Sequence, residues 1–181
     1  MMDVVSFEHF TTAQREEAAS ILMRALAHAP SAYHTIEEAR AEVEKLSNEE
    51  RLGLGAVRSG RLAGWIGAIR TYDRGWELHP LVVDPEFQRR GIGKTLVHAL
   101  EARARGENIL TLYLGTDDDF AGTSLFGADL YPDLLASLSA IEPRGGHPFT
   151  FYRRVGFSLA GVLPDVNGKG KPDILMAKRI V

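Results

Sequence analysis

The stretch Trp76-Glu77-Leu78-His79-Pro80-Leu81-Val82-Val83-Asp84-Pro85-Glu86-Phe87-Gln88-Arg89-Arg90-Gly91-Ile92-Gly93-Lys94-Thr95-Leu96 organises the chain. Its apolar and β-branched residues predict a strand, which Asp84-Pro85 ends. A loop with Gly91 and Gly93 then opens into a helix, and glycines let the backbone approach a ligand closely. The first turn of a helix offers amide N–H groups and the positive end of the dipole. The stretch therefore predicts an anion site that suits a pyrophosphate.

The spacing of the glycine loop excludes two familiar nucleotide motifs. A P-loop needs a glycine five positions before Gly93, where this chain has Gln88, and a dinucleotide fingerprint needs a small residue where it has Leu96. The remaining pattern, Gln88 to Gly93, resembles the Q/R-x-x-G-x-G/A loop of the GNAT superfamily of acyl-coenzyme A N-acyltransferases. The resemblance implies acetyl-CoA as co-substrate, with its pyrophosphate in this loop. The alternative is a plain strand-turn-helix connection whose glycines serve packing.

The predicted strand carries ionisable residues on an otherwise apolar segment. Alternation places Glu77, His79 and Leu81 on one face, and Trp76, Leu78 and Pro80 on the other. Pro80 has no N–H for the ladder, so it predicts a bulge or a local parting from a neighbour, with an ordinary strand end as the alternative. In the GNAT family such a gap takes the pantetheine arm and places a backbone N–H near the thioester oxygen.

The resemblance implies roles for residues at this gap. Acylation of an amine needs the neutral amine, so a base is expected. Glu77 is the candidate, with a surface salt bridge as its alternative explanation, and His79 is a secondary site residue. Phe151-Tyr152-Arg153-Arg154-Val155-Gly156-Phe157 resembles the F-Y-x-x-x-G-F element of the family, which implies that Tyr152 protonates or positions the thiol. The catalytic candidates are Glu77, Tyr152, His79 and Leu81, and the cofactor-binding candidates are Leu81, Val82, Val83, Gln88, Arg89, Arg90, Gly91, Ile92, Gly93, Lys94, Thr95 and Tyr152.

A closer resemblance covers the chain from about Gly64 to the C-terminus. The segments that carry it are Trp76 to Val83, Tyr113-Leu114-Gly115-Thr116-Asp117-Asp118, Asp129-Leu130-Tyr131, His147-Pro148, Gly161-Val162-Leu163-Pro164, Lys171-Pro172-Asp173-Ile174 and Met176-Ala177-Lys178. They look like the aminoglycoside 6'-N-acetyltransferases of the GNAT type, specifically the chromosomal enterococcal kind. That family has an acidic pair after a proline, where this chain has Pro30-Ser31-Ala32-Tyr33.

The closer resemblance implies an aminoglycoside as substrate and a homodimer. Asp117, Asp118 and Asp119 follow a predicted strand end, and an acidic cleft would concentrate a polyamine. A solvated acidic loop is the alternative, most of all for Asp119. The substrate-binding candidates are Glu77, Tyr72, Asp117 and Asp118. Two further hypotheses stay open: an acetyltransferase for another amine, such as a polyamine, a protein lysine or an N-terminal amine, and a coenzyme A-binding module without catalysis.

Composition limits the other classes of function. The 181 residues, 45% hydrophobic and 25% charged, suit one domain over residues 1–181. The net charge of −3 argues against nucleic acid as the main partner. There is no cysteine, and the six histidines show no metal-ligand spacing, so we expect no metal. Since neither a signal peptide nor an apolar run of membrane-span length is visible, we expect a cytoplasmic protein without a membrane partner.

The rest of the chain predicts a GNAT-type α/β fold: a mixed, mostly antiparallel sheet with flanking helices and a bulged central strand. Capping boxes at Thr11/Gln14 and Thr35/Glu38 predict two helices, and the alternating charges of the second are interpreted as a solvated face. Ala29-Pro30-Ser31 predicts the break between them. The expected strands are 4–7, 54–57, 62–69, the central strand, 109–114, 157–163 and 174–180, and the expected helices are 12–27, 35–46, 93–105, 130–141 and 148–155. Residues 115–119 and 165–173 are expected to be loops.

Overall fold

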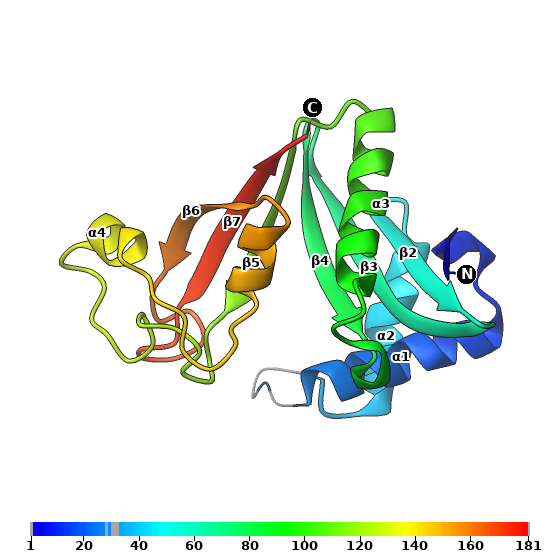
Figure 1. The fold of residues 1–181 in the computed structure, drawn as a ribbon, viewed down its shortest axis with the longest axis horizontal. Helices are drawn as coiled ribbons and strands as arrows, with labels where there is room; N and C mark the ends of the chain where they lie inside the picture. Colours follow the sequence, from blue (N-terminus) through cyan, green and yellow to red (C-terminus); the bar gives the residue numbers. More distant parts are fainter. Residues whose placement is uncertain (1, 28, 30–32, 181) are drawn as a thin grey trace. The chain divides into compact units, whose positions relative to one another are not determined.

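A computed structural model describes residues 2–27, 29 and 33–180 (Figure 1). These residues fall into two compact units, the first within Met1–His28, Ala32–Leu112 and Ile180–Val181, and the second within Ala29–Ser31 and Tyr113–Arg179. A single domain over residues 1–181 stays a prediction. The expected break at Pro30-Ser31, and the departure from the resembled family at Pro30-Ser31-Ala32, lie outside the described residues.

The first unit contains an antiparallel run of four strands. In sheet order these are β1 (Met2–Ser6), β2 (Arg51–Arg58), β3 (Arg61–Tyr72) and β4 (Gly75–Val83). Ser59 and Gly60, which join β2 to β3, both have positive φ angles of 50° and 79°. This is the backbone that a two-residue hairpin turn needs, and the hairpin predicted there is confirmed.

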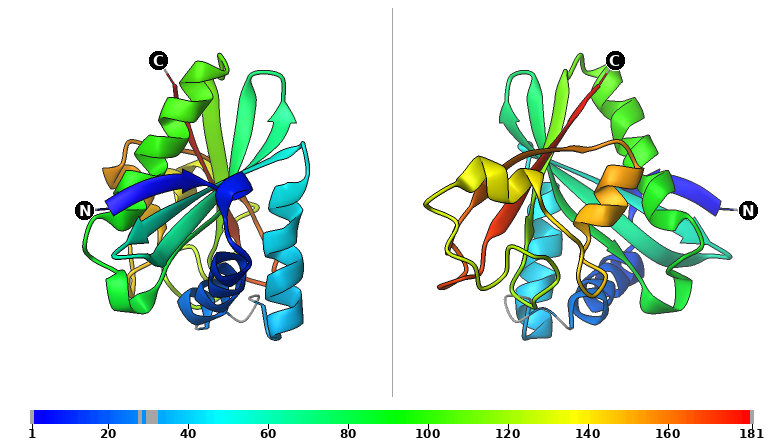
Figure 2. Two further views of the ribbon diagram at one scale, coloured as in Figure 1. Left: turned by 90° about the vertical axis from the view of Figure 1, so that its right-hand side faces the viewer. Right: turned by 60° about the vertical axis from the view of Figure 1, so that its left-hand side comes forward.

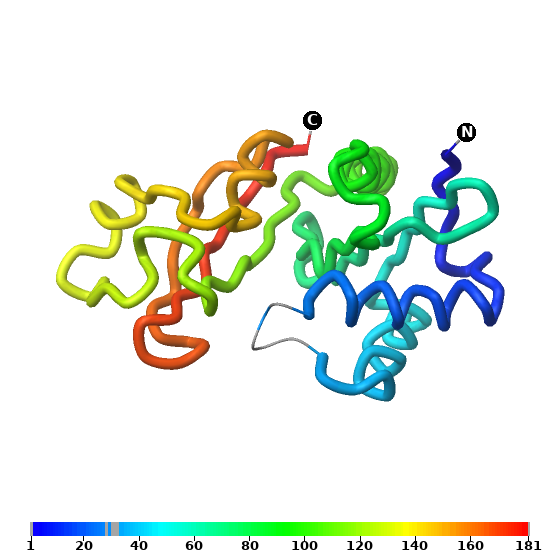
Figure 3. The backbone as a smooth tube through the Cα atoms, turned by 60° about the horizontal axis from the view of Figure 1, so that its bottom comes forward, coloured from blue at the N-terminus to red at the C-terminus, as the bar shows by residue number. Residues whose placement is uncertain are grey.

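Two helices cover one face of these strands. α1 (Thr12–Leu26) and α2 (Ile36–Glu44) both begin with the predicted capping boxes. They lie side by side (Figure 3), and the guanidinium of Arg40 donates to the carboxylate of Glu16 at 2.8 Å. Beneath them a core forms that includes the buried Leu22, Trp65 and Val82. The Trp65 indole donates to the Ala18 carbonyl at 3.0 Å, which satisfies its buried N–H.

The third helix of this unit lies on the other face of the strands. α3 (Ile92–Gly106) follows the short 3₁₀ helix η3 (Pro85–Phe87), and a further 3₁₀ helix, η2 (Lys45–Ser47), continues α2. The left view of Figure 2 shows α3 and α2 on opposite sides of the strands. The face that each β4 side chain takes therefore decides whether it meets α3 or the pair α1 and α2.

A bulge interrupts the pairing of β4 with β3. Ile66 pairs with Leu81 and Ala68 pairs with Leu78, so His79 and Pro80 together oppose Gly67. A Cβ atom at Gly67 would lie 2.4 Å from the His79 carbonyl oxygen. The bulge predicted from Pro80 is confirmed, and it forms where β3 has no side chain to block the approaching carbonyl.

The bulge resets which face the β4 side chains occupy. Before it, Glu77 pairs with Ile69; after it, Val82 pairs with Trp65. Ile69 and Trp65 are four residues apart on β3, so they share a face. Glu77 and Val82 therefore both face α1 and α2, while Leu81 faces the opposite way. The prediction that Leu81 shares the face of Glu77 and His79 was wrong, because simple alternation does not count the extra residue.

The second unit contributes three strands in the order β5 (Thr111–Asp117), β7 (Asp173–Arg179) and β6 (Ser158–Leu163), of which β5 begins in the first unit. β5 continues through Asp117, so residues 115–117 are strand and not the loop predicted there. Gly115 is tolerated because β7 passes close by: a Cβ at Gly115 would lie 2.3 Å from an Asp173 carboxylate oxygen.

Two short helices complete this unit. They are α4 (Leu134–Ser139) and α5 (Phe149–Arg154). α4 is shorter than the predicted 130–141 because its first turn begins at the Asp133 cap, whose carboxylate accepts from the Ala136 N–H at 3.1 Å.

The seven strands of the sheet run β1-β2-β3-β4-β5-β7-β6. The crossover through α3 joins β4 to β5, the type of connection that parallel neighbours need. The predicted fold class, a mixed and mostly antiparallel sheet with flanking helices, is confirmed. Among the described residues, no helix is both long and apolar enough to cross a membrane.

We predict that Gly67→Ala destabilises the protein by about 1–3 kcal/mol, because the new methyl group displaces the His79 carbonyl or the strand that carries it. Urea unfolding measures this loss. Gly106→Ala is the matched control, since a Cβ there meets nothing within 4 Å and Ala favours a helix. A Gly67→Ala protein as stable as the Gly106→Ala protein would show that the bulge adapts without cost.

Candidate functional site

The turn after β4 is anchored to α1 by a buried carboxylate. Asp84 is 1% exposed, pairs with the guanidinium of Arg24 and accepts the Glu86 N–H at 2.9 Å. Burial alone would raise the pKa of Asp84, but the Arg24 hydrogen bond, the Glu86 N–H and the Arg24 charge together hold it below its usual value. The carboxylate is therefore ionised at neutral pH and fixes the point at which the glycine loop begins.

The glycine loop has the backbone of an anion site. Arg89 and Gly91 both have positive φ angles, 59° and 83°, and the Gln88 side-chain amide donates to the Val83 carbonyl at 3.1 Å, which ties the loop to the end of β4. A Cβ at Gly91 would meet nothing within 4 Å, so the space above the loop is open. When residues with left-handed backbone angles alternate with ordinary ones along a loop, successive N–H groups point to the same side and can together bind an anion.

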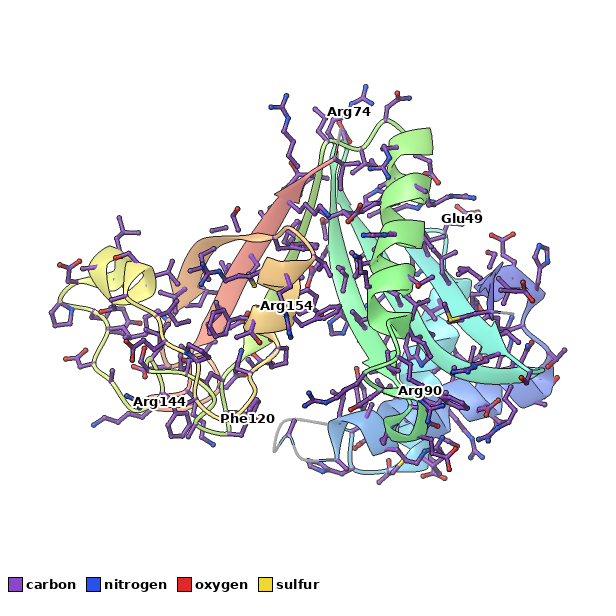
Figure 4. All side chains as sticks on the ribbon, in the orientation of Figure 1. Glu49, Arg74, Arg90, Phe120, Arg144 and Arg154 are labelled. Atoms are coloured by element: carbon purple, nitrogen blue, oxygen red, sulfur yellow. The ribbon has the colours of Figure 1, made fainter. Side chains whose placement is uncertain are left out.

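The start of α3 completes this site. Gly91 is the N-cap of α3, no side chain caps the helix, and its first turn holds no acidic residue. Lys94 lies in the first turn. Figure 4 shows Arg90 near the start of the helix. The amide groups of Ile92, Gly93 and Lys94 have no partner within the helix itself. The geometry and the charge both suit a phosphate group.

The ionisable residues of β4 lie on the face of α1 and α2. Glu77 is half-buried, and the His79 side chain is 45% exposed with Nε2 lying 3.7 Å from a carboxylate oxygen of Glu42 on α2. Glu42 is 5% exposed, so the interpretation of α2's charges as a solvated face was wrong at this position. Tyr72, at the end of β3, is 70% exposed.

The three apolar candidates after the bulge differ in burial. Val82 is buried in the core beneath α1 and α2, whereas Leu81 and Val83 are half-buried. Gly64 opposes Val83 across the strand pair, and a Cβ there would lie 2.6 Å from the Val82 carbonyl. This segment of β4 therefore packs tightly against β3. A donor role for the Leu81 N–H stays a prediction.

Tyr152 lies in the second unit, on α5. This helix begins after Pro148 and ends before Gly156, whose φ of 97° is the left-handed conformation predicted for the residue after the C-cap. The Tyr152 ring packs edge-on against Phe151 and Phe157, at 5.2 and 5.6 Å between centroids. Burial raises the pKa of its phenol. The hydroxyl is therefore protonated at neutral pH and has no hydrogen-bond partner among the described residues, so it can donate to a ligand.

His147 supports the start of α5 and received no role from the sequence. It is fully buried; its Nδ1 accepts the Phe149 N–H at 3.1 Å, so Nε2 carries the proton and donates to the Asp117 carbonyl at 3.0 Å. Its ring also stacks on Phe120. Burial lowers the pKa of this imidazole, although Asp117 and the neighbouring aspartates oppose the shift. A histidine immediately before the helix-starting Pro148 was the signal that could have indicated this link.

The aspartates that follow β5 differ from one another. Asp118 is fully buried, and its carboxylate accepts the Gly122 N–H, the Thr123 N–H and the Thr123 hydroxyl at 2.7, 2.8 and 2.6 Å. These bonds shape the loop and favour a structural role for Asp118. Asp117 is exposed, and its carboxylate accepts from the Asn167 side chain at 2.5 Å. Asp119 is buried as well.

The predicted site residues divide between the two units. The first unit brings together the glycine loop and the β4 candidates, because β4 leads directly into the turn at Asp84. The second unit holds Asp117, Asp118 and Tyr152, with His147 linking the β5 end to α5.

Comparison with known proteins gives one consistent result. The model of the acetyltransferase (GNAT) family matches residues 13–125. The chain is 37% identical to an aminoglycoside 6'-N-acetyltransferase whose crystal structure contains coenzyme A, with a TM-score of 0.91 over 99% of this chain and 97% of that one. The aminoglycoside 6'-N-acetyltransferase from Enterococcus faecium matches with the same identity and coverage and a TM-score of 0.88.

A curated relative is also named as an acetyltransferase. The N-alpha-acetyltransferase RimI of Mycobacterium tuberculosis is 39% identical over 71 residues, which are 38% of this chain and 44% of that protein. The match thus spans less than half the length of this curated relative. Since the family model covers more than half of the 181 residues and two solved structures match over nearly the whole chain, the chain belongs to the GNAT family of acetyltransferases.

Proposed function

We propose that the protein is an acetyl-CoA-dependent N-acetyltransferase that acetylates a primary amine, the 6'-amine of aminoglycosides. Such an activity would make its host resistant to these antibiotics. The observation that carries the proposal is the similarity to aminoglycoside 6'-N-acetyltransferases over 99% of the chain at 37% identity. The residues that the acetyltransferase family model matches, 13–125, include both the glycine loop and the β4 candidates.

The glycine loop fits the anionic part of acetyl-CoA. Gln88 to Thr95 combine open space at Gly91, first-turn amides without a partner inside the helix, and the cations of Arg89, Arg90 and Lys94. Leu81, Val82 and Val83 are proposed to contact the pantetheine arm. Bound there, acetyl-CoA supplies an activated acetyl group on a thioester.

The chain's own residues then have three tasks. Glu77 accepts one proton from the substrate ammonium, directly or through water, and holds the cation beforehand. The Leu81 N–H donates to the acetyl oxygen as negative charge develops on it. Tyr152, whose phenol is kept protonated by burial, donates its hydrogen to the leaving thiolate, and its phenolate regains a proton when the acetylated nitrogen loses its second one. His79 is a secondary residue of this site.

The substrate side is proposed from charge. Glu77, Tyr72 and Asp117 stay substrate-binding candidates, since carboxylates and an aromatic face both attract amines. The Asp118 carboxylate already accepts hydrogen bonds from the Gly122 and Thr123 N–H groups. Asp118 therefore stays a candidate through the loop that it shapes and not through direct contact with the substrate. A homodimer and a cytoplasmic location stay predictions; light scattering after gel filtration measures the first.

A second candidate is acetylation of an N-terminal α-amine of a protein. The similarity to the N-alpha-acetyltransferase RimI favours it, though it covers 38% of this chain. Both substrates are primary amines, so the chemistry proposed for Glu77 and Tyr152 applies to either one. The two candidates differ in which groups flank the reacting amine.

We predict that the purified protein releases free coenzyme A from acetyl-CoA when kanamycin is added. The test measures thiol release over a panel of kanamycin, a related aminoglycoside with a hydroxyl at the 6' position, spermidine, and peptides with a free N-terminus. Release with kanamycin but not with the 6'-hydroxyl compound supports the proposal, and NMR of the product identifies the acetylated nitrogen. Release with the peptides alone would move the assignment to the second candidate.

We predict that Gly91→Val weakens acetyl-CoA binding severely, because the side chain enters the open space above the loop and valine disfavours a positive φ. Isothermal titration calorimetry measures the affinity. Gly127→Val is the matched control: Gly127 has a similar φ of 76° and equally open surroundings, and it lies outside the loop. If the folded Gly91→Val and Gly127→Val variants bound acetyl-CoA equally well, the pyrophosphate would not bind at this loop.

We predict that Glu77→Gln lowers kcat/KM for kanamycin about 10²- to 10⁴-fold near neutral pH, the loss expected for a missing general base. The defect should shrink as pH rises, since more of the amine is then already neutral. A pH profile of kcat/KM for both proteins checks this. A variant that matches the wild type at neutral pH excludes Glu77 from proton transfer.

A further inference from the structure

A buried carboxylate on α2 reaches towards the β4 candidates. The Glu42 side chain is 6% exposed and accepts hydrogen bonds from the ammonium of Lys45 at 2.7 Å and from the guanidinium of Arg51 at 3.0 Å. The hydroxyl of Tyr33 also donates to it. The fourth neighbour is His79, whose Nε2 lies 3.7 Å from the same oxygen that binds Arg51.

Glu42 is held in one place from several directions. Its partners come from the segment before α2, from η2, from β2 and from β4. Burial by itself raises the pKa of Glu42, but the Lys45 hydrogen bond, together with the charges of His79, Lys45 and Arg51, lowers it below the usual value. Glu42 is therefore a fixed anion at neutral pH, and its burial is compensated by its partners.

The backbone of His79 is fixed as well. Its carbonyl lies against Gly67 at the bulge, where no side chain intervenes. A side chain whose backbone is fixed and whose Nε2 faces a carboxylate has little freedom to turn. A carboxylate next to one ring nitrogen favours the tautomer that carries its proton there. Nδ1 then keeps its lone pair, and the side chain is exposed enough, at 45%, for a ligand to reach it.

We propose that Glu42 is a positioning residue for acetyl transfer: it holds the His79 imidazole as the Nε2–H tautomer, so that Nδ1 is a second acceptor, beside Glu77, for the one proton that the substrate ammonium loses. The proposal rests on the function proposed above. The proton leaves the substrate nitrogen for Nδ1, the nitrogen keeps the electron pair that attacks the acetyl group, and the imidazolium that forms faces the Glu42 anion.

The charges around His79 explain why the anion is needed. Lys45 and Arg51 are cations of the same cluster, and they would repel an imidazolium if Glu42 were neutral. Glu77 is the other ionisable residue on this face of β4. The separation of 3.7 Å is longer than a hydrogen bond, as is common for catalytic pairs before the substrate binds.

The tautomer of His79 is measured first, because it does not depend on activity. Nitrogen-15 NMR of the wild-type protein at alkaline pH should show Nε2 protonated and Nδ1 unprotonated, with the signals assigned through His79→Asn. Glu42→Gln should lose this preference, because a side-chain amide both donates and accepts. A wild-type His79 with its proton on Nδ1 overturns the proposal, even if no variant folds.

A double-mutant cycle then tests the link to catalysis. Glu42→Gln should lower kcat/KM about 10- to 100-fold, the loss that a misplaced catalytic group causes, and should have no further effect in a His79→Asn background. Glu101→Gln is the control: Glu101 is similarly buried, pairs with Arg105 on α3 and should retain wild-type kcat/KM. Equal losses from Glu42→Gln in both backgrounds would show a merely structural role. A wild-type protein inactive on every amine refutes the proposed function, while the NMR result still decides how His79 is held.

Discussion

The two-against-one pairing of His79 and Pro80 with Gly67 is the constraint on which the site depends. A β-strand that is fully paired repeats its faces every second residue, so it cannot turn Leu81 and Val82 to new sides. The extra residue does this without breaking the strand. It lets Val82, after the bulge, enter the core beneath α1 on the same face that Glu77 and His79 occupy towards α2. Gly67 makes the arrangement possible, because any side chain would collide with the His79 carbonyl.

The helices on that face then serve two purposes. Their apolar stripe builds the core, in which Ile21, Leu22 and Val43 are fully or almost fully buried. Near the end of α2, the side chain that points inwards on this face is the Glu42 carboxylate and not an apolar group. A lone buried charge there would be costly, and the hydrogen bonds from Lys45 and Arg51 remove most of that cost. Because Glu42 is paired in this way, α2 both packs on the core and holds a carboxylate near His79 on β4.

The second unit relies on polar links where its helices are short. α5 has six residues, too few for a helix that is stable by itself. Pro148, Gly156 and the His147 bond to the Phe149 N–H set where it starts and stops. The buried Asp118 shapes the loop to which Phe120 (labelled in Figure 4) belongs, and Phe120 stacks on His147. Side chains that look catalytic in the sequence thus support the helix that presents Tyr152.

The sequence by itself determined the features that depend on near neighbours: both capping boxes, the Ser59-Gly60 hairpin, the glycine loop and the order of helices and strands. Each of these is decided by residues within one turn of one another. Tertiary structure alone decided the face of Leu81, the burial of Glu42 and Asp118, and the extension of β5 through Gly115. Those outcomes depend on which residues from distant parts of the sequence become neighbours in the fold, such as Gly67 and His79, or Gly115 and Asp173. A local pattern cannot specify them, because burial and register are properties of the partner as much as of the residue itself.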